Sequence, residues 1–205
     1  MESEDAISPV VGVMLMLVVT IIIAAVVSAF AGGLAENTEK TPQAAIDVKI
    51  STMGGGMGGA EANAEFKLLS GDAIPTKDLA IVTYYTNSTG YTYRHEQTAT
   101  SEMTSLYSFG DYPARVPYLN DMRYGYAGGD GGGGNPAVDF GGFTWKVGDV
   151  MCTNGNAGTA DLLGINDGAG GFAADADFGA GDVVDVKILH IPSGKYIYDQ
   201  EVVVI

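Results

Sequence analysis

The longest apolar stretch of the chain lies close to its N-terminus. No ionisable side chain interrupts residues 6–35. At about 1.5 Å per residue, a helix over this stretch is roughly 45 Å long, more than the ~30 Å hydrocarbon core of a bilayer. Ser8 can cap the helix, and Pro9 suits its first position because a missing N–H costs nothing there. The pattern therefore predicts a membrane-length helix, which Pro42 ends near Thr41.

Beyond residue 42, apolar and polar positions alternate over short segments, which is typical of β-strands. Strands are expected at residues 45–51, 64–69, 79–86, 91–95, 182–191 and 195–205. Residues 87–90 (NSTG) and 192–194 (PSG) each look like the turn of a hairpin. A short helical turn is expected near residues 102–107, and a loop over the glycines of 128–135. The fold class predicted is α+β, with a long N-terminal hydrophobic helix followed by an antiparallel β-sandwich-like head domain.

Three interpretations of the apolar segment are open. A secretory signal peptide fits a cleavage site at residues 29–31 (AFA), but the first five residues carry no Lys or Arg and the apolar run is too long. A plain transmembrane anchor fits the length, although Lys40 alone does not fix its orientation. The third is a helix that leaves the membrane and packs against copies of itself. It is favoured by two adjacent rows of small residues, spaced every four positions, at Ala24, Ser28, Gly32 and at Ala25, Ala29, Gly33.

Residues 5–16, DAISPVVGVMLM, resemble the N-terminal domain of archaeal type IV pilins. The family pattern is a small residue, an aliphatic residue and then Ser-Pro-Val-(Ile/Val)-Gly, which Ser8, Pro9 and Gly12 match. The resemblance implies that a membrane prepilin peptidase cuts between Ala6 and Ile7. It divides the chain into a leader (1–6), a hydrophobic helix for membrane and filament core (7–41) and an extracellular head (42–205). The hairpin of residues 182–205 is similar to the C-terminal end of many archaeal pilin-like proteins.

The function implied by the resemblance is that of a structural subunit. The chain would be held in the cell membrane as a precursor and then polymerised, with the pilus assembly machinery, into a helical homopolymer outside the cell. The filament would serve surface or cell attachment. The alternative is a monomeric, membrane-anchored extracellular β-domain that binds a ligand, which shares every feature except polymerisation.

Composition narrows the partners further. The net charge is −15, and removal of three acidic residues with the leader would make it −12. Such a surface repels nucleic acid and attracts cations, so no nucleic-acid partner is expected. Cys152 is the one cysteine, which excludes an intramolecular disulfide, and it is expected to be buried.

No catalytic constellation stands out. His95 and His190 fall in predicted strands without a marked nucleophile or acid partner, so the chain is not expected to be an enzyme. No cofactor is expected, apart from a weak Ca²⁺ candidate. That candidate rests on Asp167, Asp175, Asp177 and Asp182 in a Gly-rich stretch, where the ligand type suits Ca²⁺ but the spacing does not match an EF-hand.

A glycosylation sequon begins at Asn87, in the predicted turn NSTG. An acceptor asparagine has to be exposed, and a turn at the surface would expose it. Modification of Asn87 is therefore expected in a surface filament.

Overall fold

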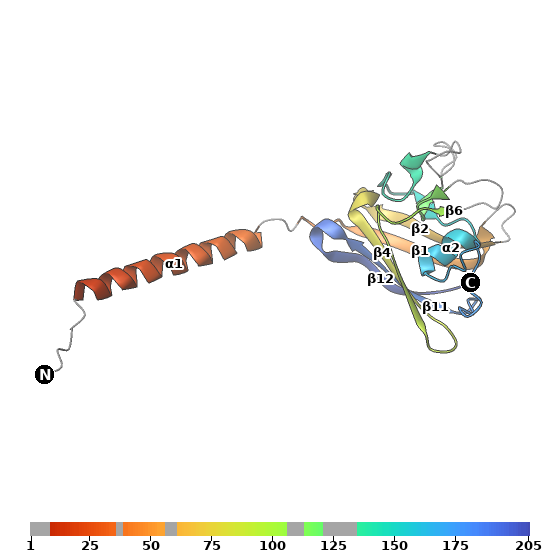
Figure 1. Ribbon diagram of the computed structural model, residues 1–205. Coiled ribbons are helices and arrows are strands. Elements are labelled where there is room, and N and C mark those ends of the chain that lie inside the picture. The colour runs from red at the N-terminus through yellow and green to blue at the C-terminus, as the bar shows by residue number, and fades with distance from the viewer. Residues whose placement is uncertain (1–8, 36–38, 56–60, 106–112, 121–134) are drawn as a thin grey trace. The chain divides into compact units, whose positions relative to one another are not determined.

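The computed structural model describes residues 9–35, 39–55, 61–105, 113–120 and 135–205 (Figure 1). It divides the chain into two units, Met1–Glu39 and Lys40–Ile205. Among the described residues, the first unit contains the helix α1 and the second contains the strands. The predicted α+β class, with an apolar helix followed by antiparallel sheets, is confirmed.

The helix α1 spans Pro9–Ala35. It begins at the proline that the sequence indicates for its first turn, whereas Ser8, the predicted N-cap, lies outside the described residues. The expected end near residue 41 is wrong, because residues 39–43 have no regular secondary structure. Gly32 and Gly33 precede the end of the helix and have low helix propensity, which favours an early stop.

Two antiparallel four-stranded sheets form the β domain. The first has the order β1 (Ala44–Gly55), β2 (Glu61–Gly71), β10 (Val150–Cys152), β8 (Tyr118–Leu119). The second has the order β12 (Lys195–Val203), β11 (Val183–His190), β4 (Leu79–Thr86), β5 (Thr92–Gln97). Two smaller ladders pair β3 (Ile74–Pro75) with β9 (Thr144–Trp145), and β6 (Thr104–Ser105) with β7 (Pro113–Ala114).

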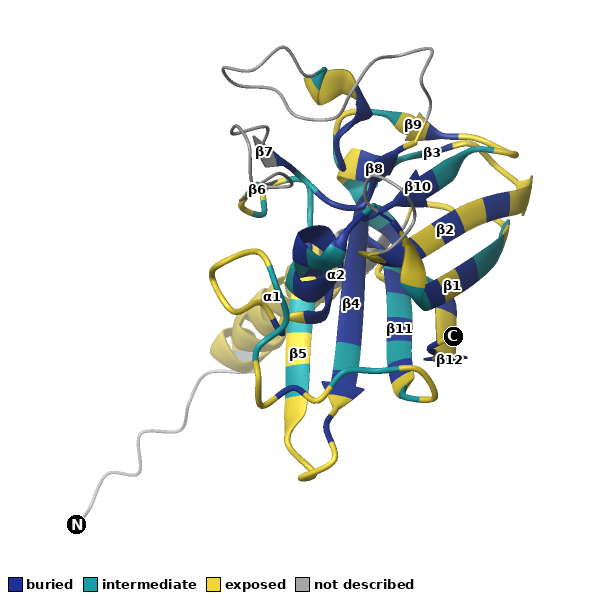
Figure 2. Ribbon diagram, turned by 90° about the vertical axis from the view of Figure 1, so that its right-hand side faces the viewer, coloured by how far each residue is buried: buried dark blue, intermediate teal, exposed yellow. Residues whose placement is uncertain are grey.

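The core lies between the two larger sheets and follows the alternation of the strands (Figure 2). On β11, the residues Val184, Val186 and Ile188 are buried and their neighbours are more exposed. In the other sheet, Phe66 and Leu68 of β2 are buried, and the residues next to them on the strand are exposed. Because side chains alternate across a strand, each sheet contributes one apolar face to a shared interior.

A second helix, α2 (Asn156–Leu163), was not expected from the sequence. It contacts β2 in one sheet and β4 and β5 in the other, so it bridges the two sheets (Figure 2). Most of its side chains are buried, and it therefore lacks the polar face that marks a surface helix. The helical turn expected near residues 102–107 is wrong at Thr104–Ser105, which form the strand β6. The loop expected over 128–135 falls almost wholly outside the described residues.

The two sheets meet along β1 and β12, which run parallel to each other. Ile50 and Val204 form an isolated bridge. Thr52 N donates to Ile205 O at 2.8 Å, and Ile205 N donates to Ile50 O at 3.0 Å. The chain end is therefore fastened to the first strand of the domain.

Candidate functional site

The helix α1 is apolar on every side. From Val10 to Ala29 all side chains are exposed within this chain, among them Val13 at 68% and Met16 at 71%. A soluble amphipathic helix has a polar face, whereas a helix that is apolar all round is normally buried in protein or lipid. The helix forms a unit of its own, separate from the β domain.

Length and composition match a membrane span. The segment Val10–Ala29 has a mean hydropathy of 3.2 and is the one candidate span found among the described residues. At about 1.5 Å per residue, the whole helix is roughly 40 Å long. Before Ser28, the one polar side chain of this segment is Thr20. Its hydroxyl donates to Leu17 O at 2.9 Å, so the hydroxyl would remain hydrogen-bonded in lipid.

Leaving this helix in water would be costly. Burial of one large aliphatic side chain stabilises by about 1.5–3 kcal/mol, so the exposed apolar side chains of α1 together represent on the order of 20 kcal/mol. That free energy exceeds the stability of a typical domain. An environment of lipid or of other apolar helices would remove this cost.

One side of α1 permits close approach of a second helix. Ala24, Ala25, Ser28 and Ala29 are exposed, in the four-residue spacing that the sequence predicts. Gly32 and Gly33 lie in the last turns of the helix. At Gly12, an added Cβ would meet nothing within 4 Å. Ala6 and Ile7, the predicted cleavage site, lie outside the described residues.

In the head, Asn87 is placed differently from the expectation. This residue is 7% exposed, so the exposure expected of the acceptor asparagine is wrong, although Ser88 and Thr89 of the sequon are exposed. Its Nδ2 donates to Asp175 O at 2.7 Å, and its Oδ1 accepts from the backbone N–H groups of Thr89 and Tyr91. The amide that a glycan would occupy therefore holds a turn and a distant loop together in the folded head.

The four aspartates of the Ca²⁺ hypothesis do not converge on one point. Asp167 Oδ1 accepts from Gly171 N and Ala169 N. These two hydrogen bonds lower the pKa of the Asp167 carboxyl, and the bond from Gly171 has the larger effect. Asp182 Oδ2 accepts from Tyr85 Oη at 2.9 Å and from Gly179 N at 2.8 Å. Within the described parts of the chain, no group of three or more His, Cys, Asp or Glu residues is arranged to hold a metal ion.

Tyr85 fastens the loop that carries three of these aspartates. Its hydroxyl lies 2.9 Å from Ala176 O and 3.1 Å from Asp177 O, besides Asp182. Burial, and then the hydrogen bond with Asp182, raises the pKa of Tyr85 well above its usual value. The ring also packs edge-on against Phe178, with centroids 5.6 Å apart. The loop is thus packed against the head by its contacts with Tyr85.

The histidines have packing roles in this structure. His190 is buried at the end of β11, and its Nδ1 lies 2.9 Å from Ser193 Oγ in the turn that leads to β12. His95 Nε2 lies 3.3 Å from Gln97 Oε1 on the same strand, β5. The two histidines therefore lie where the sequence predicts, within strands.

Cys152 is fully buried at the end of β10, as expected. Burial raises the pKa of its thiol to about 12, and the negative charge of Glu65 adds to the shift. Because the thiolate is the reactive form, this cysteine is chemically protected. The structure thereby disfavours an intermolecular disulfide through Cys152.

We expect Cys152 in the folded chain to resist a disulfide reagent at pH 8 and to react fully once the protein is denatured. At a pKa near 12, roughly one thiol in ten thousand is ionised at that pH. The variant Ser88→Cys adds a cysteine in an exposed turn and serves as a reactive control. Peptide mass spectrometry distinguishes labelling of this cysteine from labelling of Cys152. Equal labelling rates for the two thiols would contradict the burial of Cys152.

An apolar helix long enough to cross a bilayer therefore precedes a β domain with two antiparallel four-stranded sheets. Residues 5–46 match the family model described as archaeal type IV pilin, N-terminal. The chain therefore carries the N-terminal domain of archaeal type IV pilins, as its Ser-Pro-Val-Val-Gly motif predicts, and this domain and the apolar helix support a pilin subunit. The family is structural, not enzymatic. Neither the curated proteins nor the solved structures gave a match to this chain.

The family match ends within β1, so it covers the helix and not the β domain. Sequence reasoning identified the functional helix because its signals are local. It did not identify the loop fastened by Tyr85 and Asn87, because these contacts join residues about ninety positions apart.

Proposed function

We propose that the chain is a structural subunit of an archaeal type IV pilus, polymerised through α1 into an extracellular filament for attachment. The observation that carries the proposal is a pilin-type N-terminal segment that opens into a helix with apolar side chains exposed on all sides. In the precursor, lipid surrounds that helix. In the filament, the helices of neighbouring subunits take the place of lipid.

Processing would precede assembly. Cleavage between Ala6 and Ile7 removes the acidic leader and leaves an apolar N-terminal segment on the mature subunit. The partners in this step are a prepilin peptidase and the assembly machinery. The small residues Ala24, Ala25, Ser28 and Ala29 then let helix backbones approach closely, where dispersion contacts hold the bundle together.

The head would coat the fibre. Its surface is strongly acidic, which keeps subunits soluble and disfavours contact with nucleic acid. Glycosylation of Asn87 remains a prediction, and its buried amide means that a glycan would have to be added before the head folds. An intact-mass measurement of the head, with Asn87→Gln as the control, decides this point.

The test of the proposal is mass spectrometry of filaments sheared from cells. We expect this polypeptide to be present with Ile7 as its first residue. A mature N-terminus at Met1 or at Gly32 would contradict the proposal. The alternative, an anchored monomeric binding protein, predicts instead that the chain stays with the membrane and is extracted by detergent as one small species.

A further inference from the structure

One end of the head gathers strand ends and turns from the first sheet. β1 begins there beside the end of β2. Gln43 N donates to Asp72 Oδ2 at 3.0 Å, so the segment that leads to α1 leaves the head at this point. Gly148 N donates to Leu68 O at 2.8 Å, and the turn before β10 therefore lies at the same end.

The second sheet contributes turns to this end as well. β1 and β12 run parallel at the bridge of Ile50 and Val204, so both begin on the same side of the head. The turn from β11 into β12 lies there (Figure 1), and so does the 3₁₀ turn Thr76–Asp78, because the next residue, Leu79, pairs with His190. We call this part of the head the lysine end and define it as residues 40–45, 69–78, 144–149 and 189–196.

The lysine end differs in charge from the rest of the head. The five acidic residues before residue 40 account for a third of the net charge of −15, which leaves −10 on the head. The lysine end contains three aspartates and four exposed lysines, Lys40, Lys77, Lys146 and Lys195. Two of the aspartates are directed towards the protein's own backbone, because Asp72 accepts from Gln43 N and Asp149 from Lys146 N. The local net charge is therefore slightly positive.

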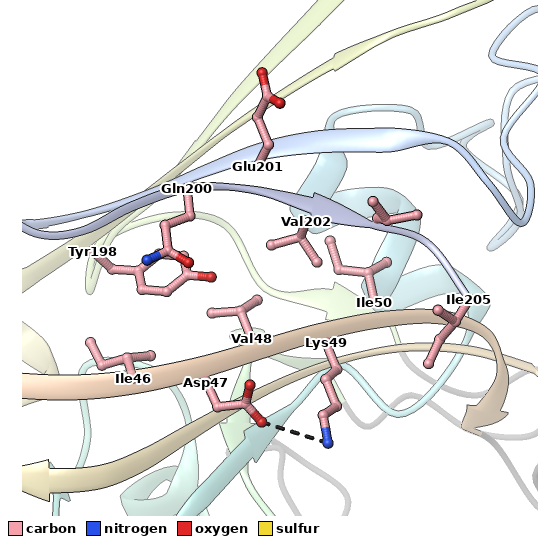
Figure 3. Close-up of a pocket in the computed structure, with 11 residues that line it drawn as sticks. Ile46, Asp47, Val48, Lys49, Ile50, Tyr198, Gln200, Glu201, Val202 and Ile205 are labelled. Atoms are coloured by element: carbon pink, nitrogen blue, oxygen red, sulfur yellow. Dashed lines mark ion pairs between the residues drawn. The ribbon is translucent and has the colours of Figure 1, made fainter.

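The four lysines form no ion pair with any described residue. Cations in the middle of the head have partners. Lys49 Nζ lies 3.6 Å from Asp47 Oδ2 (Figure 3), and Lys187 Nζ lies 2.6 Å from Asp199 Oδ1. Lys67 is exposed and unpaired within the described residues, and it lies on β2 close to the lysine end. The lysines that can reach an outside partner are thus concentrated at one end.

The opposite end of the head is acidic. β11 begins there, and residues 153–182, which precede it, contain five aspartates and no lysine or arginine. Tyr85 and Asn87 hold this segment to the end of β4 through hydrogen bonds to Ala176 O and Asp175 O. The two ends therefore differ in sign of charge, and an anionic surface attracts the lysine end and repels the other.

Exposed apolar side chains accompany the lysines. Four of them are about half exposed at the lysine end: Leu69, Val147, Ile191 and Tyr196. Tyrosine is enriched where a membrane meets water, and lysine can extend its ammonium to the headgroups while its stem contacts apolar groups. Apolar side chains such as Tyr91 and Val183 are exposed at the opposite end too, so charge distinguishes the two ends. Apolar and basic groups together bind proteins to the surface of anionic membranes.

A membrane that holds α1 is within reach of the lysine end. Eight residues, 36–43, connect the end of α1 to the start of β1, and an extended chain of that length spans at most about 30 Å. Because α1 has the length and composition of a membrane span, lipid headgroups lie near the start of this connection in the precursor. The connection therefore keeps the effective concentration of that surface high around the lysine end.

We propose that the lysine end of the head binds an anionic membrane surface, namely that of the membrane in which α1 of the same chain is embedded. The lysines contact lipid phosphates, the four apolar side chains enter the headgroup region, and the acidic end points away from the membrane. Each lysine near such a surface strengthens binding about fivefold. The proposal rests on α1 as a membrane span and not on polymerisation, so it applies to a pilin precursor and to an anchored monomer alike.

The test is carried out on the full chain in lipid vesicles. Ser70→Cys places a dye at the lysine end, and Ser88→Cys places it in the hairpin turn at the opposite end. Both serines are exposed, whereas Cys152 is buried and stays unlabelled. A nitroxide on the lipid headgroups quenches a dye that lies at the membrane surface. With phosphatidylglycerol in the vesicles we expect about threefold stronger quenching at residue 70 than in pure phosphatidylcholine, and little quenching at residue 88 in either lipid.

Two charge-reversal pairs separate the lysine end from the net charge of the head. Lys77→Glu with Lys195→Glu is expected to reduce quenching at residue 70 to its level in neutral lipid. Lys49→Glu with Arg94→Glu changes the net charge equally outside this end, so it should keep most of the quenching. Salt at about 1 M, where the Debye length is ~3 Å, should act like the first pair. Thermal unfolding verifies each fold, and Lys77→Gln with Lys195→Gln replaces the first pair if that pair is unstable.

Equal quenching at residue 70 in anionic and neutral vesicles would overturn the inference, because the connection to α1 alone would then hold the head near lipid. An equal effect of the two charge-reversal pairs, or equal quenching at residues 70 and 88, would do the same. Quenching that falls as the protein is diluted with lipid would identify a second head as the partner in place of the membrane surface. None of these results bears on filament assembly, which mass spectrometry of sheared filaments tests separately.

Discussion

Replacing Ala25 and Ala29 together by leucine is expected to reduce surface filaments at least tenfold and to leave the amount of membrane-held subunit unchanged. Both positions are exposed on α1 and lie one turn apart. Added methylene groups at a close helix contact cost about 1–3 kcal/mol by overpacking, and the cost recurs at every subunit of a fibre. Leucine is as compatible with lipid as alanine, so insertion of the precursor is not impaired.

The matched control is the pair Ala25→Ser and Ala29→Ser, which keeps both side chains small. We expect it to retain filaments. Electron microscopy counts the fibres, and immunoblotting of membranes measures the subunit. Normal fibres from the leucine variant would contradict close packing along this face, and loss of the subunit from membranes would indicate a defect in insertion or turnover instead.

Phe66→Ala is expected to destabilise the head by about 3–5 kcal/mol, since it removes a large, fully buried ring from the interior. Phe66 lies at the centre of β2, where its neighbours are Val48 of β1 and Met151 of β10. A cavity at this point affects the core that both sheets share. A loss of this size is a large part of the total stability of a domain.

Denaturant unfolding of the full chain in detergent measures this change, with the buried Trp145, the one tryptophan of the sequence, as the fluorescent reporter. The adjacent Lys67→Ala serves as the control, because Lys67 is exposed on the same strand and its loss should cost less than about 0.5 kcal/mol. Similar midpoints for the two variants would contradict a shared core centred on Phe66.

Local patterns predicted much of the fold. The strand β4 was expected at its observed bounds, Leu79–Thr86, because a run of β-branched and aromatic residues ends at a turn rich in Asn, Ser and Gly. The hairpin partner β5 follows, with Thr86 opposite Thr92. The terminal hairpin of β11 and β12 was equally clear from its alternation. In each case neighbours in sequence are also neighbours in the sheet.

Features that depend on tertiary contacts were not predictable in this way. The helix α2 has a sequence with glycine and threonine that favours no helix strongly, and packing between the sheets overrides that preference. Asn87 lies in a turn, as predicted, but its amide is buried by a loop from residue 175. The contact between Thr52 and Ile205, near the ends of the first and last strands of the head, joins residues 153 positions apart.

For α1 too, some features follow from the local sequence and others depend on what surrounds the helix. The apolar length of α1 and its rows of small residues can be read directly from the sequence, because helical spacing alone determines them. What surrounds these residues cannot be read from one chain, since the covering surface belongs to lipid or to other subunits. The family match supports the pilin assignment for this segment.

A reconstruction at side-chain resolution of filaments sheared from cells tests the central claim most directly. We predict a core of packed α1 helices, with Ala25 and Ala29 at the closest approaches between neighbours and the β domains on the outside. Fibres built without this polypeptide, or fibres in which α1 lies outside the core, would contradict the account.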